Sequence, residues 1–236
     1  MQTQKVNLIT IGMKEENAEK NLEIGEVISK SELFLQKYQK TIIAAVIAVL
    51  VIIVAIFGIK KWVIEPRENA ANEQIFAAEN WFGMDNYELA LNGNEKFVGF
   101  AAVADQYGST KAGKRAKYCA GICELRLGKY DEAIKYFNSY NGKDTFTKAQ
   151  CQMLLGDAYF EKGDINKAVS QYEKAISMSN DELVAPAAML KAGFAYMELG
   201  NKDKAKAQFE AIKTQYPTST ENAEVDRYIA LIEYGE

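Results

Sequence analysis

The chain has 236 residues, a formal net charge of −4 and 48% hydrophobic residues, enough for one domain with a core beside a membrane segment. The acidic balance gives no indication of a basic surface, so no nucleic-acid partner is expected. The sequence contains no histidine, which removes Ser-His and Cys-His nucleophile pairs, HExxH zinc sites and the commonest general base.

The first 29 residues are predicted to form a polar tail. Residues 1–41 contain six Lys and six Glu, so this segment is neutral overall and is not a polybasic arm for lipid binding. The stretch Ser29-Lys30-Ser31-Glu32 fits the S-x-x-E capping box. It predicts a helix that begins near residue 30 and continues through the membrane to residue 64.

Residues 42–59 form an unbroken apolar run without a charged side chain. As an α-helix this run would be roughly 27 Å long, close to the hydrocarbon thickness of a bilayer. A helix on the surface of a soluble protein would need a polar face. The run therefore predicts the core of a single transmembrane helix. The alternative is a cleaved signal peptide, which would lie nearer the N-terminus and precede a small-residue cleavage site.

The orientation of this helix is not decided by charge. Three basic residues flank each end, and the positive-inside rule gives a tie. They are Lys30, Lys37 and Lys40 before the run, and Lys60, Lys61 and Arg67 after it.

Residues 68–236 are predicted to form the soluble domain, beyond a break that Pro66 permits. Residues 70–110 are expected to be a divergent first hairpin, with helical spacing of apolar residues in its first part. Within it, residues 86–94 are predicted to be a loop, because they end in the turn-forming sequence Asn-Gly-Asn. Residues 221–234 are expected to be a terminal helix that caps the domain.

Three repeats lie between these two segments, at residues 114–140, 149–176 and 186–217. Matching positions recur with spacings of 35 and 37 residues. They are Gly121, Gly156 and Gly193; Gly128, Gly163 and Gly200; Ala133, Ala168 and Ala205; and Phe137, Tyr172 and Phe209. A period near 34 with this pattern is typical of the tetratricopeptide repeat.

Each repeated position has a physical reason. The first glycine lets two helices approach closely, and the second ends the first helix in a left-handed conformation. The alanine is expected at the helix crossing, and the aromatic residue is expected to fill the gap between repeats. The fold class predicted is all-α: one N-terminal transmembrane helix followed by a tetratricopeptide-repeat α-solenoid with no sheet.

The sequence offers no enzymatic chemistry. No glycine-rich phosphate loop is present, and the three cysteines, Cys119, Cys123 and Cys151, form no CxxC motif and are expected to be small buried residues. Asp157 and Glu161, one helical turn apart, are read as solvated or partner-facing charges rather than an acid/base or metal pair. No catalytic residue, metal or cofactor is predicted.

The predicted site is a partner-binding groove on the first helices of the repeats. The repeat register places the following residues on that face: Arg115, Tyr118, Ile122, Arg126, Met153, Asp157, Phe160, Glu161, Leu190, Phe194, Met197 and Glu198. The groove would be apolar along its middle, basic at one end and acidic at the other. The alternative is that the N-terminal hairpin or the terminal helix covers the apolar members.

The chain resembles bacterial membrane-anchored tetratricopeptide proteins, and more closely the YfgM-like proteins. The segments Leu91–Asn94, Phe97–Phe100 and Tyr107–Gly113 are similar to versions in Bacteroidetes-type members. The chain departs from the repeat consensus at Lys117, Glu124 and Gln152. The resemblance implies a single-pass protein of the bacterial inner membrane, with its domain in the periplasm near the Sec translocon, periplasmic chaperones and exported chains.

These observations leave three candidate functions. Two are non-enzymatic interaction proteins, and the third is an enzyme or its regulatory subunit. The first is a membrane-tethered interaction module that serves protein export, held in the membrane by residues 42–59. The second is a scaffold subunit of another envelope complex, in cell division or cell-wall assembly. The third, an enzyme or its regulatory subunit, is disfavoured by the missing nucleophile and base.

Overall fold

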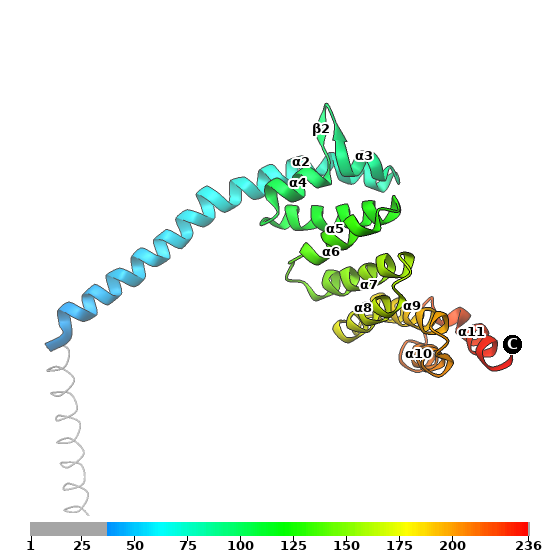
Figure 1. Ribbon diagram of the computed structural model, residues 1–236. Coiled ribbons are helices and arrows are strands. Elements are labelled where there is room, and N and C mark those ends of the chain that lie inside the picture. The colour runs from blue at the N-terminus through cyan, green and yellow to red at the C-terminus, as the bar shows by residue number, and fades with distance from the viewer. Residues whose placement is uncertain (1–36, 236) are drawn as a thin grey trace, which may run out of the picture. The chain divides into compact units, whose positions relative to one another are not determined.

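The computed structural model describes residues 37–235, and the chain divides into two compact units, the first ending at Trp62 and the second beginning at Val63. The predicted tail at 1–29 and the capping box predicted before the apolar helix lie outside the described residues. Figure 1 labels the elements of the second unit.

The described part of the first unit is an apolar helix. Residues 37–59 are α-helical, and bulky apolar side chains are exposed on every face, with Val54 70% and Phe57 68% exposed. Within residues 37–235, one helix, Lys37–Gly83, contains a window long and apolar enough to cross a membrane, and none of that window is buried. It is a candidate membrane-spanning helix.

The break expected at Pro66 is wrong. Lys60–Ile64 form a single π-helical turn, η1, and α2 (Glu65–Gly83) follows it directly, with Pro66 in its first turn. Proline has no N–H to donate, and its ring crowds the carbonyl one turn earlier, that of Trp62. The chain is nonetheless helical on both sides of Pro66, where the sequence pattern suggested an interruption.

The N-terminal part of the domain pairs α2 with α4 (Phe100–Tyr107), and a short insertion separates them. The insertion contains α3 (Tyr87–Asn92), β1 (Gly93–Asn94) and β2 (Phe97–Val98). Two predictions are therefore wrong: residues 86–94 are not a loop, and a two-stranded antiparallel ribbon is present. The side chain of Asn86 caps α3 by accepting from the Leu89 amide at 3.2 Å. The side chain of Asn94 accepts from the Phe97 amide at 3.2 Å and forms the turn.

The remaining helices form three helix pairs and a terminal helix, stacked in chain order (Figure 1). The pairs are α5 (Lys111–Arg126) with α6 (Tyr130–Ser139), α7 (Thr145–Glu161) with α8 (Ile165–Met178), and α9 (Val184–Glu198) with α10 (Lys202–Gln215); α11 (Asn222–Tyr234) follows. The predicted fold class, an all-helical repeat solenoid after one apolar helix, is confirmed apart from the small ribbon.

The first glycine of each repeat lies under the aromatic ring of the same repeat. A Cβ atom added to Gly156 would lie 2.5 Å from the ring of Tyr172, and one added to Gly193 would lie 2.2 Å from that of Phe209. The pair Gly121 and Phe137 has the same arrangement. The ring thus joins the two helices of its own repeat, whereas the sequence analysis had placed it between repeats.

The second glycine of each repeat ends the first helix. Gly128, Gly163 and Gly200 have φ values of 73°, 80° and 71°, which non-glycine residues rarely adopt. In the second repeat, the amide that follows this glycine donates to the carbonyl of Tyr159, five residues earlier, at 2.9 Å, as in a Schellman motif. The other two repeats have the same bond. The left-handed turn predicted from the sequence is confirmed.

Glu124 stands on α5 at the position that Tyr159 and Tyr196 occupy in the later repeats. Its side chain is only 8% exposed, and within residues 37–235 one of its carboxylate oxygens has no hydrogen-bond partner. Burial raises the pKa of this carboxyl above its usual value. The first full repeat therefore contains a destabilising polar group that the other two lack.

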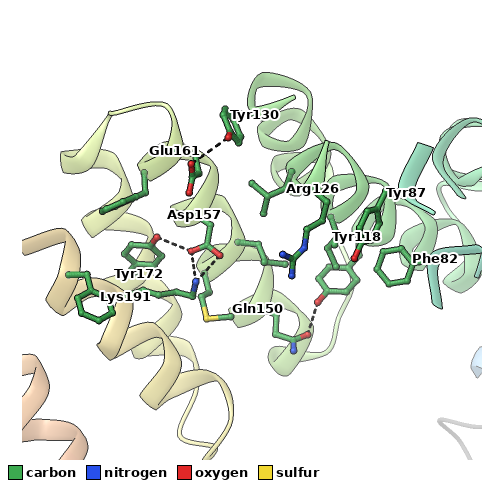
Figure 2. A pocket seen from close by; sticks show the side chains of 16 residues that line it. Phe82, Tyr87, Tyr118, Arg126, Tyr130, Gln150, Asp157, Glu161, Tyr172 and Lys191 are labelled. Carbon is green, nitrogen blue, oxygen red and sulfur yellow. Dashed lines mark hydrogen bonds and ion pairs between the residues drawn. The ribbon is translucent and has the colours of Figure 1, made fainter. Parts of the chain in front are cut away.

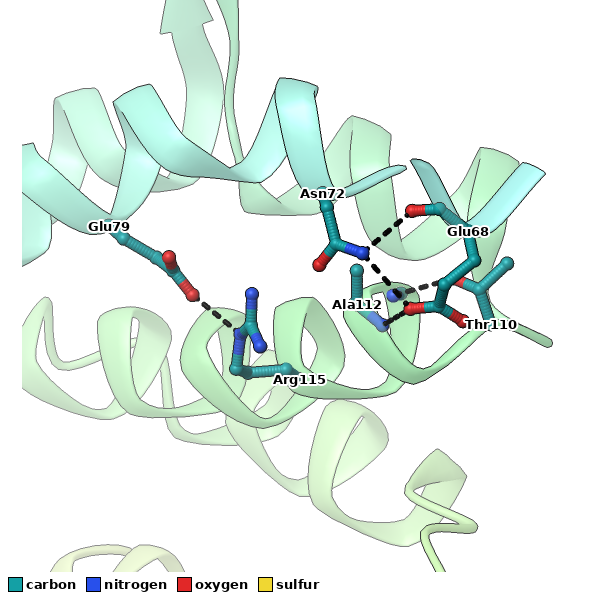
Figure 3. A network of polar contacts seen from close by, with 7 residues as sticks. Glu68, Asn72, Glu79, Thr110, Ala112 and Arg115 are labelled. Atoms are coloured by element: carbon teal, nitrogen blue, oxygen red, sulfur yellow. Dashed lines mark hydrogen bonds and ion pairs between the residues drawn. The ribbon is translucent and has the colours of Figure 1, made fainter. Parts of the chain in front are cut away.

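Helix α2 is attached to α5 by polar contacts, which Figure 3 shows. The Glu68 carboxylate accepts from the backbone amides of Lys111 at 2.8 Å and Ala112 at 3.0 Å, the first two residues of α5. A carboxylate is favourable there because helix N-termini carry unpaired N–H groups and a positive dipole end. A second contact, between Glu79 and Arg115 at 2.5 Å, holds the same two helices together further along.

The contact between ring and glycine gives a direct test of the repeat architecture. Gly156→Ala should lower the melting temperature of the full chain, because the added methyl group overpacks the ring of Tyr172 at a cost of about 1–3 kcal/mol. Thermal unfolding followed by circular dichroism measures this. Gly83→Ala is the matched control, because a Cβ atom at this last residue of α2 meets nothing within 4 Å. Equal melting temperatures for the two variants would contradict the proposed packing.

Candidate functional site

The repeats and the N-terminal unit line an open cavity of about 880 Å³ on the side of the first helices α5, α7 and α9. This volume lies in the range of pockets that hold ligands or side chains of a partner. Figure 2 shows the cavity with its lining side chains. They are Phe82, Tyr87, Tyr118, Ile122, Leu125, Arg126, Tyr130, Gln150, Met153, Leu154, Asp157, Phe160, Glu161, Tyr172, Lys191 and Phe194.

Most of the residues predicted for the groove line this cavity. They come from three different helices, which the repeat register brings to one face: Tyr118, Ile122 and Arg126 from α5, Met153, Asp157, Phe160 and Glu161 from α7, and Phe194 from α9. The lining mixes apolar and aromatic side chains with four charged ones, so the predicted apolar middle is not found: Asp157 and Lys191 lie among the apolar groups.

Four predicted residues lie elsewhere. Arg115 forms its ion pair with Glu79 of α2, outside the cavity. Leu190 and Met197 are half-buried against the core formed by the last two repeats and α11. Glu198 is exposed at the end of α9.

The terminal helix also covers part of the predicted face. The ring of Phe194 lies edge-on to Tyr228 of α11, with ring centroids 4.7 Å apart, and 5.7 Å from Phe209 of α10. Phe194 thus packs in the core and lines the cavity at once. The open part of the face is formed mainly by α5 and α7.

The divergent N-terminal unit supplies one wall of the cavity, which the sequence analysis missed. Phe82 is on α2 and Tyr87 begins α3, and their rings meet edge-on with centroids 5.7 Å apart. This unit lacks the repeat pattern, so no register could place these two rings. By contrast, Leu125 lies at the repeat position of the predicted groove residue Phe160, and Gln150 lies at that of Arg115. The repeat register could therefore have predicted both as lining residues.

A polar network crosses the floor of the cavity and joins the second and third repeats (Figure 2). The Asp157 carboxylate accepts from the Tyr172 hydroxyl at 2.8 Å and from the Lys191 ammonium group at 3.0 Å. Burial and the neighbouring Asp157 raise the pKa of Tyr172, so this hydroxyl remains a donor at physiological pH. The carboxylate and the ammonium group neutralise each other, and neither is left as a free charge.

The other polar side chains on the lining have local partners, with one exception. Tyr118 donates to Gln150 at 3.0 Å, and burial raises the pKa of its hydroxyl. Tyr130 approaches Glu161 at 3.4 Å. The guanidinium group of Arg126, in contrast, has no hydrogen bond or ion pair to any of residues 37–235 and points into the cavity (Figure 2).

The cysteines are structural. Cys119, Cys123 and Cys151 are free and buried, and burial raises the pKa of each thiol to about 12. A thiol that stays protonated is a poor nucleophile and a poor metal ligand. Within residues 37–235, no group of three or more His, Cys, Asp or Glu side chains is arranged to hold a metal ion.

Two family matches fall on the repeats whose geometry is described above. Residues 156–200 match the family described as TPR repeat, and residues 187–219 match the one described as Tetratricopeptide repeat. No curated protein matches the chain. The matches support a tetratricopeptide repeat protein. Such repeats indicate a protein–protein interaction module, a class of protein that is typically not enzymatic.

The floor network predicts a measurable coupling between the second and third repeats. A double-mutant cycle with Asp157→Asn and Lys191→Met should give a favourable coupling free energy of about 0.5–1.5 kcal/mol, because the pair is partly buried and hydrogen-bonded. Chemical unfolding of the full chain measures it. The pair Asp131 and Lys162 is the control: its lysine is as exposed as Lys191, but its carboxylate is 73% exposed against 19% for Asp157, so its coupling should be weaker. Equal coupling energies for the two pairs would contradict a structural role for the floor network.

Proposed function

We propose that this protein is a membrane-tethered interaction module that serves protein export, as an ancillary factor of the Sec translocon and the periplasmic chaperone network. The observation that carries the proposal is the cavity, which offers aromatic and apolar side chains and an unpaired cation on the inner face of a repeat stack. Half-buried Met153 and Phe160 suit varied apolar side chains, because methionine adapts its shape and aromatic rings provide large contact areas.

The apolar helix supports the tethering. Anchored by residues 42–59 in the inner membrane, the domain would stay close to the bilayer where exported chains emerge. A tether raises the effective concentration of the binding site, so weak binding to each chain is sufficient. The choice of export over division or wall assembly rests on the resemblance to the YfgM-like proteins.

The proposal fixes a topology, with residues 1–41 in the cytoplasm and 60–236 in the periplasm. Alkaline phosphatase fused after Glu236 should be active, because this enzyme folds only in an oxidising compartment. A green fluorescent protein at the same site, exported through the Sec route, should be dark. The reverse pair of results would contradict the periplasmic orientation.

The role of the cavity is tested by affinity purification of the full chain in mild detergent. Phe160→Ala should reduce the yield of co-purified partners about fivefold or more, because aromatic anchors in a pocket usually dominate such interfaces. Phe146→Ala is the matched control, since Phe146 is on the same helix, 41% exposed, and outside the cavity.

The identity of the lost partners decides between the export role and the scaffold alternative. Translocon subunits and periplasmic chaperones among the lost partners would support the export role, while division or cell-wall proteins would favour the scaffold alternative. Equal yields from both variants, with unchanged helix content, would show that the cavity is not the binding surface.

A further inference from the structure

Arg126 is an exposed cation on the cavity lining that makes no direct ion pair with any of residues 37–235, the carboxylate of Glu161 on the same lining included. It is the last residue of α5, and its guanidinium group points into the cavity (Figure 2). Within residues 37–235 it has no hydrogen bond and no ion pair. The other cation of the lining, Lys191, is neutralised by Asp157. An unpaired guanidinium group beside aromatic rings is a ready partner for an anion.

Helix stability alone does not account for this charge. A cation in the last turn of a helix is favourable, and that would be a sufficient reason for Arg126 in isolation. The equivalent residues of the other two repeats, however, are Glu161 at the end of α7 and Glu198 at the end of α9. Carboxylates are unfavourable there. The charge at this register position is therefore not set by the helix end.

Aromatic and apolar side chains lie on both sides of Arg126 along the stack. Phe82 and Tyr87 come from the unit before α5, and Phe160 and Phe194 come from the helices after it. A bound segment can therefore bury bulky side chains before and after the point at which it meets Arg126. Glu161 on the same lining disfavours a second acidic residue towards α7.

We infer that the cavity binds an internal segment of a partner protein that places one Asp or Glu side chain against Arg126, with bulky apolar side chains on both sides. The planar guanidinium group binds a carboxylate through two parallel hydrogen bonds, which fixes the register of the segment. An internal residue fits better than a chain end, because the apolar lining continues in both directions from Arg126. The inference rests on the proposed function, since it uses the same cavity.

The test measures peptide binding to the full chain in lipid nanodiscs by fluorescence anisotropy, with empty nanodiscs subtracted. The probe is a capped ten-residue peptide, Gly-Ser-Leu-Phe-Leu-Glu-Leu-Phe-Gly-Ser, with a label at its N-terminus. A second peptide has Gln in place of Glu. A third has Gln there and a free C-terminal carboxylate directly after its last Phe.

The Glu peptide should bind roughly tenfold or more tightly than the Gln peptide, as expected for a charge-assisted hydrogen bond. Arg126→Gln should remove this preference, and Arg126→Lys should keep only part of it. Arg115→Gln should keep it fully, because Arg115 is on the same helix but pairs with Glu79 outside the cavity. Circular dichroism should show equal helix content and melting temperature for Arg126→Gln and the natural chain.

Equal binding of the Glu and Gln peptides to the natural chain, or an unchanged preference in Arg126→Gln, would overturn the inference. Equally tight binding of the third and the first peptides would also overturn the inference. The third peptide has Gln in place of Glu, so its carboxylate could come only from its C-terminal end. If Phe160→Ala weakens all peptides equally while no Glu preference exists, the proposed function stands and this inference fails. Absence of binding by every peptide would contradict both.

Discussion

The close contact between an aromatic ring and a glycine within each repeat determines the geometry of the domain. Because Gly156 has no side chain, Tyr172 of α8 packs directly on α7, and the same contact recurs between Gly193 and Phe209. The contact sets how closely the two helices of a repeat approach, and hence where the first helices lie. In the second repeat it also reaches the cavity: the ring that packs on Gly156 carries the hydroxyl that binds Asp157.

At both ends of the stack, residues predicted to line the groove pack against a neighbouring helix. At the N-terminal end, Glu79 of α2 pairs with Arg115, and Glu68 caps α5. At the C-terminal end, α11 covers the ring of Phe194 with Tyr228. A repeat stack needs such atypical terminal units, because each repeat would otherwise leave an apolar face exposed. The part of the predicted groove that lines the cavity is therefore concentrated on α5, which carries Arg126, and on α7.

The parts of the fold that follow a repeat could be predicted from the sequence. The period placed Gly163 in a left-handed turn and brought Tyr118 and Met153 to one face, since identical backbone positions point the same way in every repeat. The divergent unit could not be predicted in this way. There, Asn86 caps a short helix that the loop prediction did not include, and Asn94 forms the turn of the ribbon.

Site-specific crosslinking in living cells tests most directly whether the cavity is the protein-binding surface. A photoreactive phenylalanine would replace Tyr130, which lines the cavity, or, as a control, Tyr234, which is 83% exposed on α11 and lies outside it. If the cavity binds proteins, position 130 should give adducts with other proteins that are missing or much weaker from position 234. Adducts from position 234 alone, or crosslinks from position 130 that reach only this chain's own residues, would contradict this role of the cavity.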